Sequence, residues 1–339
     1  MSAISIDADD VPSQAKATTV SIGIFAHNEE ATIRAVLDGF LEQRVSRAVI
    51  EGIIVVCCGC TDRTLPLVSA VMREQPRVEM VIRQKREGKI AAINAFLEAA
   101  DADVLILASA DVVPAPDLVE RLALPLIEEP SFAMTGPRIV TWPAVIPGRV
   151  VDNLHNALWN LHHVISLRSP KLGEIVAVRR IAVPGLLPDD AHCDEALLES
   201  IVVERGGKLG YVPSALAYNS PPRSLGEFYL QRRRIAAQHV LLRRARGYRP
   251  ATTKPRFVIG ALRRSLSGPL RARSHVLLLC LLQSAACLHG RWDVLRGRDY
   301  RLWRVTRRGP SPDDCRPGRA SDRLPCVPAI AGDMTGTRQ

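Results

Sequence analysis

Polar residues that could bind a nucleotide, a metal ion or a proton directly follow three apolar stretches of the sequence. These polar stretches are "AHNEE", "CCGCTD" and "SADVVP", which begin at Ala26, Cys57 and Ser109. Any one of them could be turn chemistry or a helix cap. Three together favour a ligand site, because ligands often bind where loops lead from strand ends into helices.

The "CCGCTD" stretch allows three interpretations. Cys57 and Cys60 have the C-x-x-C spacing of redox and zinc sites. Zinc needs two further ligands, and His192 with Cys193 is the nearest comparable pair, more than a hundred residues away. A nucleotide-binding turn is the more economical interpretation, because Gly59 permits a positive φ and the following Thr-Asp can cap a helix. The cysteines are then incidental.

Strands and helices alternate around these polar stretches. Apolar runs at residues 19–26, 50–56, 78–83 and 102–108 predict strands, and amphipathic runs at 28–43, 64–75 and 88–100 predict helices. Such alternation indicates an α/β fold with a mostly parallel sheet and covering helices. Ligands bind beyond the carboxyl ends of the strands in such sheets, where the three polar stretches lie.

The remaining sequence predicts helices and disordered tails. Residues 152–167 and 224–247 have helical patterns, and residues 208–219 read as extended. We expect a disordered tail at 1–17, an α/β domain at 18–222, a basic helical segment at 223–305 and a second disordered tail at 306–339.

Charge is distributed unevenly along the 339 residues. The net charge is +10, yet residues 231–308 contain 20 Lys and Arg against two acids. Such a segment predicts an anionic partner, and phospholipid is favoured over nucleic acid because aromatic residues are only 4% of the chain. The apolar run at 275–290 is shorter than the ~20 residues that span a bilayer. It predicts an interfacial or re-entrant helix on anionic lipid, or else a helix packed on the main domain.

The start of the chain and its cysteines predict a location. Met1 is followed by acidic and polar residues without an apolar leader, so we expect the main domain to stay in the cytosol. The eight cysteines are scattered and would remain reduced there.

The order of six motifs resembles glycosyltransferase family 2, inverting enzymes of the GT-A fold. The motifs are "VSIGIFAHNEEATI", "IIVVCCGCTDRT", "REGKIAAINAFLEAA", "LILASADVVP", "CDEALLESIVVERGGKLGYVP" and "QRRRI", and they extend from about Thr18 to Arg244. The resemblance implies transfer of a sugar from a nucleotide-sugar to a hydroxyl acceptor with the help of Mg²⁺ or Mn²⁺.

The resemblance assigns the donor site. Residues implied in binding the nucleotide-sugar are His27, Asn28, Glu29, Cys58, Asp62, Lys89, Ser109, Asp111, Gln231 and Arg234. Asp111 matches the metal-binding acid of the D-x-D motif, whose first acid is Ser109 here. Cys57 and Cys58 replace two acids, one of which usually binds the base or ribose of the nucleotide, so UDP is only weakly preferred over GDP. Asn94 is expected to hold nearby loops.

The resemblance places the general base in "CDEA". The family usually has Glu-Asp at this point, whereas this chain has the reverse order. The position of the base in the motif falls on Glu195, but its usual residue type, aspartate, is found at Asp194, and both stay candidates. In "QRRRI" the usual tryptophan is Ile235, so a polymer channel is not expected, and the two arginines at 232 and 233 could face lipid headgroups.

Three histidines on the predicted helix at 152–167 complete the set of candidate site residues. His155, His162 and His163 lack the i,i+4 spacing of metal ligands, which favours packing or acceptor contacts.

The sequence therefore predicts a peripheral enzyme on the inner face of the cell membrane that transfers one sugar to a lipid-linked or membrane-associated acceptor. Two alternatives remain. One is a degenerate protein that binds nucleotide-sugar or membrane without catalysis, and the other is a soluble glycosyltransferase of secondary metabolism.

Overall fold

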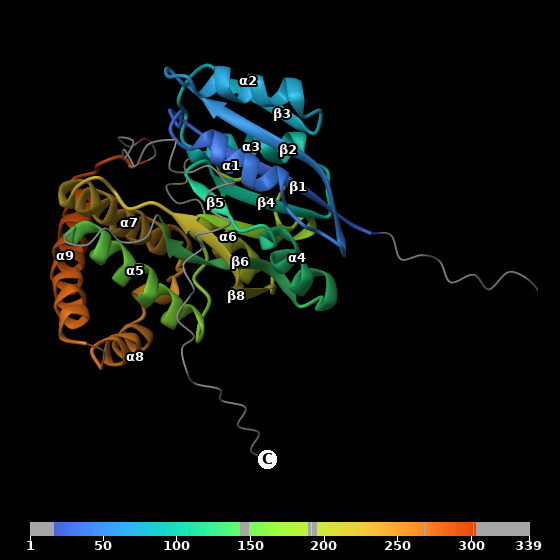
Figure 1. Cartoon of the computed structure of the whole chain (residues 1–339). Coiled ribbons are helices and arrows are strands. Elements are labelled where there is room, and N and C mark those ends of the chain that lie inside the picture. Colours follow the sequence, from blue (N-terminus) through green and yellow to red (C-terminus); the bar gives the residue numbers. More distant parts are fainter. Residues whose placement is uncertain are drawn as a thin grey trace, which may run out of the picture.

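The computed structural model describes residues 17–142, 149–188, 191, 195–267, 269–300 and 302. Eight strands form one sheet in the order β3-β2-β1-β4-β7-β6-β8-β5 (Figure 1). The strands are β1 (Thr18–Ala26), β2 (Ala48–Cys58), β3 (Val78–Arg83), β4 (Val104–Ser109), β5 (Val112–Pro114), β6 (Phe132–Thr141), β7 (Ile175–Arg179) and β8 (Lys208–Asn219). The predicted tails lie outside the described residues, apart from Ala17.

The first half of the chain confirms the predicted alternation. Strands β1 to β4 are parallel and are connected through α1 (Ile33–Leu41), α2 (Thr64–Glu74) and α3 (Lys89–Ala99). β1 is buried on both faces: its Ile22 and Ile24 pack in one core cluster with α1, and its Phe25 packs in the other with α3. A strand covered on both sides must be apolar at successive positions, which explains the runs of Val and Ile.

The second half of the sheet is mixed rather than parallel. β7 is antiparallel to both β4 and β6, β8 is parallel to β6, and β5 is antiparallel to β8. α4 (Leu118–Glu128) precedes β6. Beyond residue 130 strands and helices still alternate, since α5 (Val150–Ser166) lies between β6 and β7 and α6 (Glu195–Glu204) lies between β7 and β8, but the strands they connect pair in both directions.

The basic C-terminal segment is helical, as predicted. α7 (Leu225–Arg246) begins at Ser224, whose hydroxyl accepts a hydrogen bond from the Glu227 amide at 3.2 Å, and ends at Gly247 with φ 68°. α8 (Pro255–Ser265) and α9 (Leu270–Leu295) follow, and α9 packs along α7 and α5 (Figure 1).

α9 is longer than the apolar run that predicted it. Its 26 residues include the arginines on both sides of that run, since arginine is a good helix former. Within the described ranges, each helix is too short or too polar to cross a bilayer.

Candidate active site

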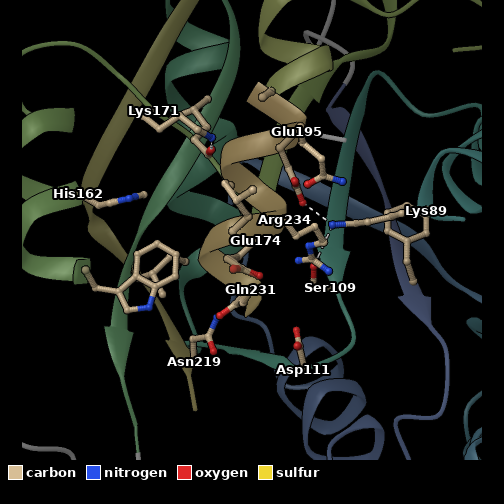
Figure 2. A pocket seen from close by; sticks show the side chains of 18 of the residues that line it. Lys89, Ser109, Asp111, His162, Lys171, Glu174, Glu195, Asn219, Gln231 and Arg234 are labelled. Carbon is tan, nitrogen blue, oxygen red and sulfur yellow. Dashed lines mark hydrogen bonds and ion pairs between the residues drawn. The ribbon is translucent and has the colours of Figure 1, made fainter. Parts of the chain in front are cut away.

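A cavity of about 270 Å³ lies beyond the carboxyl ends of β1, β2 and β4. Nine of the predicted site residues line it: His27, Glu29, Cys58, Lys89, Ser109, Asp111, Glu195, Gln231 and Arg234. They come from strand ends, from the first residues of α3 and α6, and from α7, which brings residues more than a hundred positions apart into one site (Figure 2). Asp194, the other candidate base, lies outside the described residues.

Hydrogen bonds connect the loop after β1 to the end of β2 and the loop that follows it. His27 Nδ1 donates to the Cys58 carbonyl at 2.6 Å, which leaves Nε2 for a ligand. Burial is the main reason that the pKa of His27 is below its usual value, so the ring is neutral at pH 7. Asn28, at φ 57°, accepts a hydrogen bond from the Thr61 amide at 2.7 Å.

Asp62 organises the same loop. Its carboxylate accepts hydrogen bonds from the amides of Glu30 at 3.1 Å and Thr64 at 2.9 Å. Burial opposes ionisation, but these hydrogen bonds and that of the Thr64 hydroxyl lower the Asp62 pKa overall. Neither Asn28 nor Asp62 is among the residues that line the cavity. Their contact with a nucleotide stays a prediction.

The three neighbouring cysteines are free thiols with different environments. Cys57 is 1% exposed in the core, and the Cys60 thiol points to the Ala26 carbonyl at 3.7 Å. Cys58 lines the cavity, and burial raises its pKa to about 11, so its thiol stays protonated at pH 7. That these cysteines are incidental to a nucleotide-binding turn stays a prediction.

Gly59 is the residue that this turn needs. Its φ is +58°, and a Cβ there would lie 2.7 Å from the Arg86 amide nitrogen. We expect Gly59→Ala to lower the free energy of unfolding by more than the ~1–2 kcal/mol of a left-handed L-residue, because the clash adds to it. Gly206→Ala is the control, since φ is +84° there but no atom lies within 4 Å. Equal losses in urea unfolding would contradict the proposed contact with Arg86.

Lys89 contacts both Ser109, at the end of β4, and Glu195, at the start of α6. It is the first residue of α3, after Gly88 at φ 99°. Its ammonium group donates to the Ser109 hydroxyl at 3.1 Å and forms an ion pair with Glu195 (Figure 2). Both charged side chains are largely buried. The structure therefore places a carboxylate and a cation at the same point of the cavity.

Asn94 holds the loop that leads towards α6, as expected from the sequence. Its side-chain amide donates to the Leu187 carbonyl at 2.9 Å and accepts from the Leu187 amide at 2.8 Å. This pair of hydrogen bonds fixes the chain shortly before Glu195.

The three histidines of α5 all line the cavity. His155 contacts the Thr141 hydroxyl at 3.0 Å and accepts from the Trp159 indole at 3.1 Å. His163 is 2.8 Å from the Tyr211 hydroxyl, and burial lowers its pKa to about 4. These contacts give His155 and His163 packing roles at the cavity wall, one of the two roles that the sequence favours.

Sequence reasoning missed several residues that line the cavity, among them Arg86, Lys171, Glu174 and Asn219. Glu174 has a φ of 64°, which is uncommon for a residue with a side chain. Its neighbour Gly173 was the one signal in the sequence that a tight backbone turn precedes β7. Arg86 begins the motif "REGKIAAINAFLEAA" but was given no role, and no motif marked Lys171 or Asn219.

The structure corrects the interpretation of the arginines at 232 and 233. Successive helical residues point about 100° apart, so the three arginines of α7 cannot share one surface. Arg232 lies buried on the cavity wall instead of facing lipid. Arg233 binds Asp293 of α9 through two hydrogen bonds of 2.5 and 2.6 Å. Arg234 lines the cavity, as predicted.

Comparison with known proteins agrees with this geometry. Residues 21–166 match the family described as Glycosyl transferase family 2. Solved structures with a similar fold include the mannosyltransferase PcManGT from Pyrobaculum calidifontis in complex with GDP-Man and Mn²⁺. That similarity has 20% identity and a TM-score of 0.59, and covers 83% of this chain and 88% of the other.

A second similar structure is the glucosyl-3-phosphoglycerate synthase from Mycobacterium tuberculosis, in complex with Mn²⁺, UDP and phosphoglyceric acid. It has 21% identity and a TM-score of 0.45, over 67% of this chain and 78% of the other. No curated protein matches the sequence.

Proposed function

We propose that the chain is a family 2 glycosyltransferase that transfers one sugar from a nucleotide-sugar to a hydroxyl acceptor by single displacement. The match of residues 21–166 to that family and the fold shared with PcManGT support this proposal. The observation that carries the proposal is the joint presence of Glu195, Lys89, Ser109 and Asp111 on one cavity at the carboxyl ends of the strands.

Lys89, Asp111 and Arg234 suit the diphosphate of the donor. Asp111 supplies a carboxylate at the cavity beside the end of β4, which is the hard oxygen ligand that Mg²⁺ or Mn²⁺ prefers. Among the described residues no three His, Cys, Asp or Glu side chains group as a metal site, so diphosphate oxygens and water would complete the coordination. When bound, the ion neutralises charge on the departing diphosphate. PcManGT was solved with Mn²⁺, which supports this choice.

Glu195 is the general base in this proposal. It removes the proton of the acceptor hydroxyl as that oxygen attacks the anomeric carbon opposite the diphosphate, which inverts the configuration. The ion pair with Lys89 orients the carboxylate. Glu195 lines the cavity and pairs with Lys89, and these two observations support it as the base, with Asp194 as the alternative.

His27, Asn28, Glu29 and Asp62 are proposed to bind the nucleotide through the loops after β1 and β2. His27 presents a neutral ring to the cavity and can stack on a base. The preference for UDP over GDP is weak in this proposal. Cys57 and Cys58 occupy the positions of two acids, one of which usually binds the nucleotide.

The acceptor is proposed to be lipid-linked or membrane-associated, with the protein peripheral on the cytoplasmic face of the cell membrane. The support is an exposed apolar stripe on α9, formed by Leu270, Leu277, Leu281, Leu288, Trp292 and Leu295. These residues recur at spacings of three, four and seven, so they share one face of the helix. Val276, Leu279 and Val294 are buried on the opposite side, against the protein.

Exposed arginines flank this apolar stripe. They are Arg271, Arg273, Arg291 and Arg296. An apolar helical face between basic residues is typical of helices that lie in the interface of an anionic membrane, where each basic residue contributes roughly 1 kcal/mol.

We expect Leu281→Gln with Leu288→Gln to lower binding to vesicles that contain phosphatidylglycerol by about tenfold or more. A fully buried leucine is worth about 1.5–3 kcal/mol, and these two are 70% and 66% exposed in the protein alone. Sedimentation with vesicles measures the effect. The control is Ile181→Gln, an 86% exposed apolar residue outside α9. Unchanged binding of the double variant would reject this face as the membrane contact.

The test of the enzymatic proposal is release of nucleoside diphosphate from UDP-, GDP-, ADP- and dTDP-sugars with and without Mn²⁺, in the presence of lipid extract. Selective, metal-dependent release from one donor with sugar transfer to an extracted lipid supports the proposal. Donor binding without turnover would favour the degenerate alternative, and transfer to a soluble acceptor without lipid would favour the enzyme of secondary metabolism.

A further inference from the structure

A buried arginine lines the cavity without an anionic partner among the described residues. Arg232 of α7 is 9% exposed, and its Nε donates to the Gln283 side chain of α9 at 2.8 Å. No other hydrogen bond or ion pair of this guanidinium group occurs in the described part of the chain. Burial lowers the Arg232 pKa to about 10, so the group stays cationic at pH 7. A buried cation is costly unless an anion compensates it.

Glu174 and Glu199 do not pair with this arginine in the described part of the chain, which leaves its charge available to a ligand. Glu174 acts on Arg232 electrostatically but forms no ion pair with it. Glu199, which is completely buried, is occupied instead by Lys171 at 3.2 Å, by the Leu172 amide at 2.6 Å and by the Tyr248 hydroxyl at 2.9 Å. The network around Glu199 therefore fixes Lys171 and does not neutralise Arg232.

His162 lies beside this arginine on the cavity wall. Its ring contacts Trp159 edge-on at 5.2 Å, and it has no hydrogen bond to the described residues. Burial, followed by the positive charges of Arg232, Lys171 and His239, keeps the His162 pKa well below its usual value. The neutral ring has one N–H donor to offer. Figure 2 shows His162 and Lys171 across the cavity from Ser109 and Asp111.

We propose that Arg232 and His162 form a second anion-binding subsite, which binds a phosphate or carboxylate group of the acceptor. The planar guanidinium can bind either group through two parallel hydrogen bonds, and the imidazole N–H can add a third. The subsite rests on the proposed function, because a donor diphosphate at Lys89 and Asp111 leaves this side of the cavity to the second substrate. The acceptor is then an anionic molecule, either a soluble phosphorylated compound or the phosphate headgroup of a lipid.

Binding of inorganic phosphate tests the subsite without any turnover. Calorimetric titration in a phosphate-free buffer is expected to show an affinity for the wild-type chain that falls at least about tenfold in Arg232→Gln, since a hydrogen bond to a charged group contributes about 1.5–3 kcal/mol. Arg243→Gln, an exposed arginine of the same helix, should bind phosphate like the wild type. His162→Phe keeps the contact with Trp159 and should weaken binding about threefold or more, which provides a second variant should Arg232→Gln unfold.

Lys89→Met separates this subsite from the donor site. If phosphate binding falls in Lys89→Met and not in Arg232→Gln or His162→Phe, the anion binds at the donor site and the proposal is wrong. Retention of phosphate binding in Lys89→Met together with its loss in Arg232→Gln supports the subsite. This result stands even if no nucleotide-sugar is turned over, so failure of the enzymatic proposal is distinguishable from failure of the subsite.

Competition identifies the source of the anion. Glycerol 3-phosphate in solution and vesicles with phosphatidic acid are each titrated against bound phosphate, with glycerol and phosphatidylcholine vesicles as uncharged or zwitterionic controls. Displacement by glycerol 3-phosphate alone indicates a soluble acceptor, and displacement by phosphatidic acid vesicles indicates a lipid headgroup. Displacement by glycerol as well as by glycerol 3-phosphate would contradict an anion-specific site.

Discussion

Glu195→Gln is expected to lower kcat for sugar transfer by a factor of about 10²–10⁴, which is the usual contribution of a general base. Glutamine keeps the size of the side chain but cannot take the proton from an acceptor hydroxyl. Affinity for the donor nucleotide should not fall, because Lys89 loses a competitor for phosphate when Glu195 loses its charge. Steady-state kinetics together with calorimetry of nucleotide binding measures both effects.

Two further variants make this expectation specific. Glu204→Gln changes an acid at the other end of α6, where the side chain is 47% exposed, and should leave kcat unchanged. Asp194→Asn tests the competing assignment. If it lowers kcat more than Glu195→Gln does, the base is Asp194, and the ion pair of Glu195 with Lys89 is structural.

The α/β part of the fold was predictable because β1, β4 and the second half of β2 are apolar at successive positions and because α1 has one apolar face. These patterns reflect burial between two layers of helices, as the two core clusters on either side of β1 show. The antiparallel pairing of β7 was not predictable in this way. Ile175 to Val178, four of its five residues, are apolar and would be so in either direction, and pairing direction is set by the long connections on both sides.

The candidate site was predictable where a motif marks a strand end or a helix start, as at Lys89 and Asp111. It was not predictable where tertiary packing decides, as at Arg232. In the sequence that residue is one of three adjacent arginines, and only the packing of α7 against α9 separates the buried one from the one that pairs with Asp293. Glu174 and Lys171 are single residues without a motif, and the cavity alone reveals them.

Asp111→Asn is expected to abolish the metal dependence of donor binding and to lower turnover by about 10²–10³. The expected size follows from the loss of a few kcal/mol of charge stabilisation on the diphosphate, comparable to the loss of one preorganised group at a developing charge. Asparagine keeps the shape of the side chain but carries no charge, so a divalent cation loses its anionic protein ligand. Asp111 is the one acid of the "SAD" motif, with Ser109 at the other position, and no second carboxylate there can compensate.

The measurement is the affinity for UDP and GDP with and without Mn²⁺, which reports on the ion independently of catalysis. In the wild type we expect Mn²⁺ to tighten nucleoside diphosphate binding, and in Asp111→Asn the two affinities should converge. Asp117→Asn, in an exposed pair with Arg121 at the start of α4, is the matched control and should keep the metal effect. Metal-enhanced binding that persists in Asp111→Asn would show that the ion is held by other groups, and Asp111 would then only shape the loop between β4 and β5.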